Sequence, residues 1–258
     1  MNDSDFLAAL HLPTITRVDQ RVPKKLLLEN GAPTAADKRS INEGIEEIIW
    51  VAALKPTNVG VPLFRDNVRE YLEVAVLCLT LRDAAKETRL LELLHRAIPY
   101  PVLLFANTPK SRSLSTAHKR WSQGDASKTV LDGELTIVQW NPAQEDPHLP
   151  AFCSALSVVH QPRTSLMTLY QGWTNTLLAL HSARFTGIFS IVTDEEHASR
   201  RHNAIREIDR IDAELVRLRA AAVQEKQMSR RVELNVEMKR FISARAQAIT
   251  NLCAPQKL

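Results

Sequence analysis

The chain has 258 residues, of which 45% are hydrophobic, and this size fits one large domain or one compact domain with an appendage. Its net charge of +4 is only mildly basic, so the composition does not mark a dedicated DNA-binding protein. Three cysteines, none in a CxxC pair, argue against a disulfide framework and against a cysteine-rich zinc site. We see no secretory signal and no apolar run of about eighteen residues, and we therefore expect a cytoplasmic protein.

Short helices are expected near the N-terminus. One helix ends before Pro13, and residues 22–30 form a second helical or extended piece. Thr34 is a good N-cap for a third helix over residues 35–44, because its hydroxyl can accept a hydrogen bond from a free amide of the first turn.

Five segments have the composition of β-strands. They are residues 45–54, 71–81, 101–108, 113–121 and 134–140. The run YLEVAVLCLTL at 71–81 is apolar almost throughout, which is typical of a central strand buried on both faces. An amphipathic helix over 84–98 follows it. We therefore predict an α+β fold, with a mixed or mainly antiparallel sheet of about five strands and flanking helices.

The second half of the chain is predicted to be helical. A proline-containing linker over 141–150 ends an α+β domain of residues 1–145. A helical layer over 146–192 follows, in which 188–192 is the one candidate strand, and residues 193–258 form the C-terminal part.

Two heptad patterns stand in this C-terminal part. The positions at this spacing are Ile208, Ile211, Leu215, Leu218 and Ala222, and then Leu234, Met238, Phe241, Arg245, Ala248 and Leu252. We favour a turn at Met228–Ser229 that folds the two segments into a long, coiled-coil-like helical hairpin, because one chain then buries both patterns. The alternative is one long helix that pairs with a second copy or with another protein.

Several stretches, in this order, are specific when taken together: QRVPKKLLLENGAPTAADKR, IIWVAALKP, LLHRAIPYPVLLF, LSTAHKRW, LYQGW and EKQMSRRVELNVEMKR. Over about residues 20–245 the chain resembles an uncharacterised bacterial family, domain-of-unknown-function family 4391. The family has no agreed activity, and its members tend to be encoded beside DNA methyltransferases and helicases of restriction-like or phage-defence loci. The resemblance implies an accessory role in DNA modification or defence, with such a helicase or methyltransferase as partner.

A local surplus of basic residues makes the region from 96 to 128 a candidate nucleic-acid interface, since cations can follow a phosphate backbone. The candidates are Arg96, Lys110, Arg112, His118, Lys119, Arg120 and Lys128. The competing interpretation is an edge strand whose charges prevent aggregation.

Catalysis has weaker support in the sequence. His95 and His118 are candidates for a general acid–base pair, although a histidine that caps the helix end is the competing interpretation for His95. Glu70 and Glu73 begin a strand, but no acid-x-Lys follows on a strand, as a metal-dependent nuclease of the restriction type requires. We predict no catalytic residue, no metal and no cofactor.

The stretch EKQMSRRVELNVEMKR carries too much apolar surface for a free helix, so it packs against something. Its candidate partner-binding residues are Arg231, Val232, Leu234, Met238 and Phe241. We predict a non-enzymatic accessory subunit that docks on a protein partner through the C-terminal helices and contacts DNA or RNA through the basic strand. The alternatives are a nuclease-like enzyme that uses His95 and His118, a homodimeric scaffold, and a hairpin that folds back onto the sheet.

Overall fold

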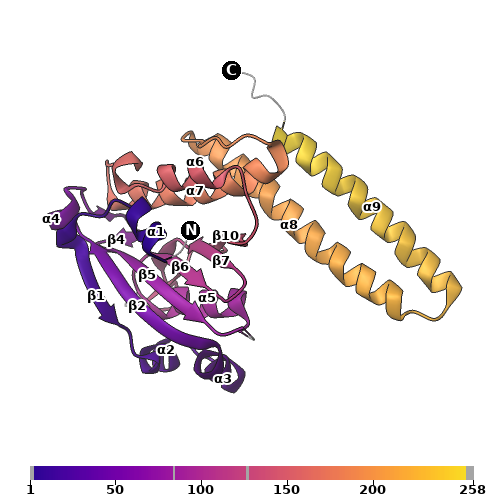
Figure 1. The fold of residues 1–258 in the computed structure, drawn as a ribbon, viewed down its shortest axis with the longest axis horizontal. Coiled ribbons are helices and arrows are strands. Elements are labelled where there is room, and N and C mark those ends of the chain that lie inside the picture. The colour runs from indigo at the N-terminus through magenta and orange to yellow at the C-terminus, as the bar shows by residue number, and fades with distance from the viewer. Residues whose placement is uncertain (1–2, 84, 126–127, 254–258) are drawn as a thin grey trace. The chain divides into compact units, whose positions relative to one another are not determined.

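The computed structural model describes residues 3–83, 85–125 and 128–253 (Figure 1). The chain divides into two compact units, Met1–Leu177 and Leu178–Leu258. The division falls inside helix α7 (Leu166–Thr186), whereas the sequence predicts boundaries near residues 145 and 192. No helix of the described residues is long and apolar enough to cross a membrane.

The first unit is built on a six-stranded sheet, which confirms the predicted α+β class. Its strands, in spatial order, are β1 (Arg17–Arg21), β2 (Ile45–Leu54), β5 (Val74–Leu81), β6 (Val102–Asn107), β7 (Arg112–Thr116) and β10 (Thr136–Trp140). β5 and β6 run parallel, and every other pair of neighbours is antiparallel. β5 lies inside the sheet and is buried along nearly its whole length, as its apolar run predicts.

Two small two-stranded sheets accompany the large one. They are β3 (Phe64–Arg65) with β4 (Glu70–Tyr71), and β8 (Lys119–Trp121) with β9 (Thr129–Leu131). The predicted strand over 113–121 is therefore two strands in different sheets, separated by Ala117 and His118. β1 is not foreseen by the sequence, because RVDQR is almost entirely exposed and lacks apolar alternation.

Helices cover both faces of the large sheet (Figure 1). They are α1 (Asp3–Ala9), α2 (Lys24–Asn30), α3 (Ala35–Gly44), α4 (Pro56–Val59), α5 (Glu87–Ala97), α6 (Leu149–Ala155) and α7, with 3-10 turns at Thr14–Thr16 and Val158–His160. Thr34 caps α3 as predicted, since its hydroxyl accepts the amide of Asp37 at 3.1 Å.

One face of the sheet packs against α2, α3 and α5. The leucines of α5, with Leu27 and Ile41, form a single core with the side chains of β5 and β6 that point to this face. α5 is the crossover that joins the parallel strands, and its leucines recur at helical spacing because only one side of it touches the sheet.

The opposite face packs against α1, α6 and the first part of α7. Phe6 stacks on Phe105 with ring centroids 4.4 Å apart, and Thr174 donates a hydrogen bond to Thr116 at 3.0 Å. The buried Tyr170 hydroxyl donates to the carbonyl of Val102 at 2.8 Å and accepts the amide of Ala117 at 2.7 Å. One phenol therefore ties α7 to β6 and to the end of β7.

The second unit contains a helical hairpin of α8 (Glu195–Gln224) and α9 (Met228–Cys253), which lie side by side (Figure 1). The break falls at residues 225–227, next to the predicted turn at Met228–Ser229. The candidate strand 188–192 has no regular secondary structure. Within this unit, His181 lies 3.2 Å from Asp209, and Arg245 contacts both Asp212 and the ring of Phe185.

Replacing Tyr170 with Phe removes the hydroxyl but keeps the ring in place. Because the buried amide of Ala117 and carbonyl of Val102 both lose this partner, we expect the free energy of unfolding to fall by about 1–3 kcal/mol. Urea denaturation measures the difference, and Tyr100→Phe, at a side chain that is 37% exposed, is the matched control. Equal stability of the two variants would contradict the role assigned to the hydroxyl.

Candidate functional site

Lys119 lies in the interior and not on a basic surface. It is 1% exposed, and its ammonium group donates to the carbonyl of Ile98 at 2.8 Å and to that of His95. These carbonyls stand at the C-terminal end of α5, where main-chain acceptors lack helical partners and the helix dipole favours a cation. Lys119 is therefore not available as one of the predicted nucleic-acid contacts, because its buried ammonium group binds the carbonyls at the end of α5.

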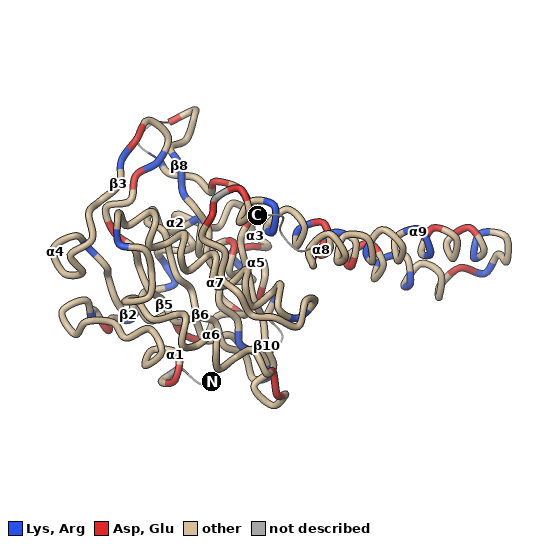
Figure 2. The backbone as a smooth tube through the Cα atoms, turned by 90° about the horizontal axis from the view of Figure 1, so that it is seen from above, with Lys and Arg blue, Asp and Glu red and all other residues tan. Residues whose placement is uncertain are grey.

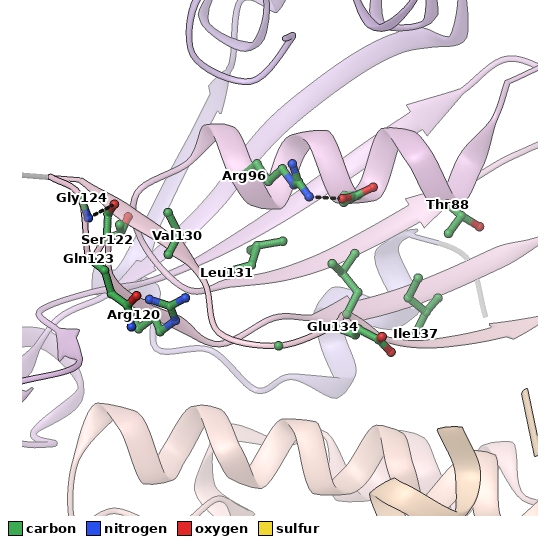
Figure 3. A pocket seen from close by; sticks show the side chains of 14 residues that line it. Thr88, Arg96, Arg120, Ser122, Gln123, Gly124, Val130, Leu131, Glu134 and Ile137 are labelled. Carbon is green, nitrogen blue, oxygen red and sulfur yellow. Dashed lines mark hydrogen bonds and ion pairs between the residues drawn. The ribbon is translucent and has the colours of Figure 1, made fainter. Parts of the chain in front are cut away.

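A groove of about 830 Å³ lies beside this point, between the exposed side of α5 and the β8–β9 hairpin (Figure 3). Arg96 of α5 and Arg120 of β8, two of the predicted contacts, both line it. Arg96 pairs with Glu92 at 2.6 Å, and Arg120 lies 3.7 Å from Asp132. The groove thus gathers two guanidinium groups, each beside an acid.

The other predicted basic residues also have partners close by. Lys110 pairs with Asp83 at 2.7 Å, and Lys128 pairs with Asp125 at 2.9 Å. Arg112 donates to two main-chain carbonyls of the turn before β7. The local surplus of positive charge seen in the sequence is therefore largely balanced by acids of the first unit, three of which lie outside residues 96–128.

The two candidate histidines have separate partners. The Nε2 atom of His95 lies 2.9 Å from the hydroxyl of Ser115, and burial, with the neighbouring Lys119, lowers the pKa of His95 to about 3. His118 is hydrogen-bonded through Nδ1 to the Tyr71 hydroxyl. Since His95 is neutral and fully buried, it cannot donate a proton as a general acid near neutral pH, and the geometry gives no support to a paired acid–base site.

The acids considered for a metal site form ion pairs instead. Glu73 is buried and lies 3.1 Å from Lys55 at the end of β2, and Glu70 pairs with Arg65. Among the described residues, no group of three or more His, Cys, Asp or Glu side chains is placed to hold a metal ion. The sequence does not reveal the Lys55–Glu73 pair, because its members are eighteen positions apart and the β3–β4 sheet lies between them in the chain.

The α8–α9 hairpin buries most of the predicted heptad positions between its two helices, and we call this contact the seam. Ile208, Ile211, Leu215 and Leu218 are buried on α8. On α9, Leu234 is buried, while Met238 and Phe241 are half-buried in the same stripe. The last three were predicted to bind a partner, and the structure corrects this: they face the seam and hold the hairpin together.

Other apolar side chains of the hairpin remain exposed. They are Val216 and Val223 on α8, at 64% and 85% exposure, and Met228, Val232, Val236 and Ile242 on α9, at 70%, 54%, 47% and 51%. Of the predicted partner-binding residues, Arg231 and Val232 lie on this exposed surface. Acidic and basic residues are interspersed along both helices (Figure 2).

Burial of Lys119 gives the stability a definite pH dependence. Desolvation lowers the pKa of Lys119 from 10.5 to about 8, so between these pH values the unfolded chain keeps a proton that the folded chain releases. Stability from this group therefore rises with pH across that window. We expect Lys119→Met to remove this rise in unfolding free energy measured by urea denaturation.

Lys128→Met is the matched control, because Lys128 is exposed, and it should keep the wild-type pH profile. An unchanged profile in Lys119→Met would show that Lys119 titrates as an exposed lysine does.

Comparisons with known proteins reach the level of a family. No curated protein and no solved structure matches the chain significantly. A family model described as "Domain of unknown function (DUF4391)" matches residues 10–243, which is most of the chain. The chain belongs to this family.

Proposed function

We propose that the chain is a non-enzymatic accessory subunit of a DNA modification or helicase system, and that its helical hairpin joins it to other protein chains. One observation carries the proposal. The hairpin closes its own seam, yet large apolar side chains on both helices stay exposed, Val223 and Met228 most of all. Apolar surface concentrated in this way is typical of protein interaction sites.

The charge of the hairpin favours a protein over a nucleic acid at this surface. Arg210, Arg217 and Arg230 each pair with a glutamate three residues away on the same helix. A phosphate backbone is bound by a field of one sign, whereas interspersed charges suit a polar rim around an apolar contact. The resemblance of the chain implies a helicase or DNA methyltransferase of a restriction-like or phage-defence locus as the larger partner.

Affinity purification of the tagged, full-length protein from its native host tests this role. We expect a helicase or a DNA methyltransferase in stoichiometric amount, identified by mass spectrometry, and its loss in the double variant Val216→Asp, Val223→Asp. Both substitutions place a charge on exposed positions of α8, so the fold should be kept, which circular dichroism checks.

Val68→Asp is the matched control, since Val68 is an exposed valine (50%) of the first unit and lies outside the hairpin. Recovery of neither enzyme with the wild-type protein would contradict the accessory role. If the double variant still recovers the helicase or methyltransferase, docking through the hairpin is contradicted.

Nucleic-acid binding is the second candidate function, and the groove beside α5 favours it. Arg96 and Arg120 are twenty-four positions apart in the chain and still line one concave surface (Figure 3). Arginine pairs in such a groove suit phosphate oxygens when the neighbouring acids give way to a stronger anion.

We expect the double variant Arg96→Ala, Arg120→Ala to bind a double-stranded DNA probe more weakly, because two phosphate contacts are lost. The slope of log affinity against log salt should become shallower by about 2, measured by fluorescence anisotropy. Arg39→Ala, which removes an exposed, ion-paired arginine of α3, is the control. Identical salt slopes for the wild-type protein and the double variant would count against this interface.

A further inference from the structure

The two outermost strands of the large sheet differ in how well they are protected against pairing. β1 has the sequence RVDQR, with three charged side chains, and its pairing with β2 shifts register between Arg17 and Gln20, where Asp19 has a φ of 50°. Charges and bulges of this kind keep foreign strands from a sheet edge. β10 has the sequence TIVQW, without a charge, and pairs with β7 in continuous register. Among the described strands, only β7 pairs with it, so its other edge is open to a further strand.

The hydrogen bonds of the neighbouring hairpin show which main-chain groups β10 presents at this open edge. The turn between β6 and β7 is closed by a hydrogen bond to the carbonyl of Ser111 at 2.9 Å, and hydrogen-bonded pairs alternate from there along the antiparallel ladder. Leu114 therefore turns its N–H and C=O groups toward its β10 partner, Val138. The residues on either side of Val138, which are Ile137 and Gln139, turn theirs outward.

β9 continues the open edge. The amide of Asp132 donates to the carbonyl of His118 at 2.8 Å, so by the same alternation Leu131 and Thr129 turn their main-chain groups outward. Thr129, Val130 and Leu131 all line the groove beside α5, although successive side chains of a strand point to opposite faces (Figure 3). The groove therefore runs along the edge of β9 and not over one face of it.

The walls of the groove suit an added strand. Leu135 and Ile137 form an apolar floor, and both pack against the core beneath α5. The opposite wall is α5, which contributes Thr88, Glu92 and Arg96. These three residues are four positions apart, so they lie along one side of the helix. A strand paired with β10 would have α5 on one side of it, as peptides have when they bind between a helix and a sheet edge.

We propose that an extended segment of a partner polypeptide adds to the sheet at β10 and lies in this groove, with an acidic side chain beside Arg96 and Arg120. Main-chain hydrogen bonds to the edge supply affinity, and the side chains that face α5 supply selectivity. Arg96 is half-exposed and binds Glu92 through one nitrogen, while Arg120 lies 3.7 Å from Asp132. Both guanidinium groups therefore keep N–H donors for a carboxylate of the partner.

The open main-chain groups favour a polypeptide over DNA in the groove. Ile137 and Gln139 turn carbonyl groups outward as well as amides, and the phosphate backbone of DNA has acceptors but no donors for these carbonyls. A strand offers donors and acceptors at the spacing of β10 itself. This docking point goes beyond the accessory role proposed above, because it does not involve the α8–α9 hairpin.

Selection from a phage-displayed library of random dodecapeptides, on the purified full-length protein, provides the probe. We expect enriched sequences in which apolar and polar residues alternate next to an aspartate or glutamate. Fluorescence anisotropy of the labelled peptide should show a dissociation constant that the double variant Arg96→Ala, Arg120→Ala raises by about tenfold. A selection that enriches no such sequence overturns the proposal.

A proline at the edge tests strand addition. Gln139→Pro removes an outward amide, so the selected peptide should bind about tenfold more weakly or worse. Arg21→Pro is the matched control on the protected edge: the amide of Val22 donates to the carbonyl of Ile48 at 2.9 Å, so Arg21 also turns its amide outward. This variant should bind the peptide as the wild type does. Equal binding by Gln139→Pro and the wild type overturns the proposal.

N-methylation of the peptide tests the same pairing without changing the protein. Methyl groups on amides that face β10 should abolish binding, and those on the alternate amides should leave it intact, because only every second residue of a strand bonds to a given neighbour. We therefore expect a period of two along the peptide. Sensitivity without this period overturns strand addition.

Two other occupants of the edge give different results. DNA is the occupant if the variant Arg96→Ala, Arg120→Ala loses affinity for a double-stranded DNA probe but not for the selected peptide. A second copy is the occupant if the wild-type protein is a dimer in analytical ultracentrifugation and Gln139→Pro converts it to a monomer. Either result overturns the proposal.

Discussion

The end of α5 inside the protein is the constraint on which the first unit depends. The parallel strands β5 and β6 can be joined only by a crossover, and this crossover must return to the start of β6 with its last carbonyl groups buried. Lys119 supplies the donor that those carbonyls require. A buried cation is costly unless its hydrogen bonds are satisfied, so the position admits few other side chains.

The surface groove is a consequence of that buried contact. Lys119 begins β8, and because its ammonium group is fixed at the end of α5, the β8–β9 hairpin is held alongside the helix. Arg96 and Arg120 therefore line one groove although they belong to different elements. Tyr170 acts on the other face of the sheet in a comparable way, joining two strands and α7 through a single hydroxyl. Buried polar groups with few alternative partners thus set the positions of neighbouring strands and helices.

Periodicity explains which parts of the fold could be predicted from the sequence. The apolar run of β5, the amphipathic pattern of α5 and the two heptad seams are local signals, and each corresponds to an element of the structure. The prediction that SLSTAHKRW forms a single strand was wrong. The strand breaks at Ala117 because the amide of this residue donates a hydrogen bond to a distant group, the hydroxyl of Tyr170. Likewise, the burial of Lys119 depends on carbonyls twenty or more residues away, which no local pattern reveals.

The partner-binding residues on α9 show a different limit of sequence reasoning. Two stripes at heptad spacing stand roughly a third of a turn apart on this helix, and spacing alone cannot say which of them faces α8. The ion pair of Arg245 with Asp212 and the burial of Leu234 decide it.

Once the seam is assigned, the second stripe stays exposed, and no described residue of the hairpin covers it. A helix that is apolar on two sides is stable only between two neighbours. The seam takes Leu234, Met238 and Phe241 out of the docking surface. The same assignment argues that another chain covers Val232 and Ile242.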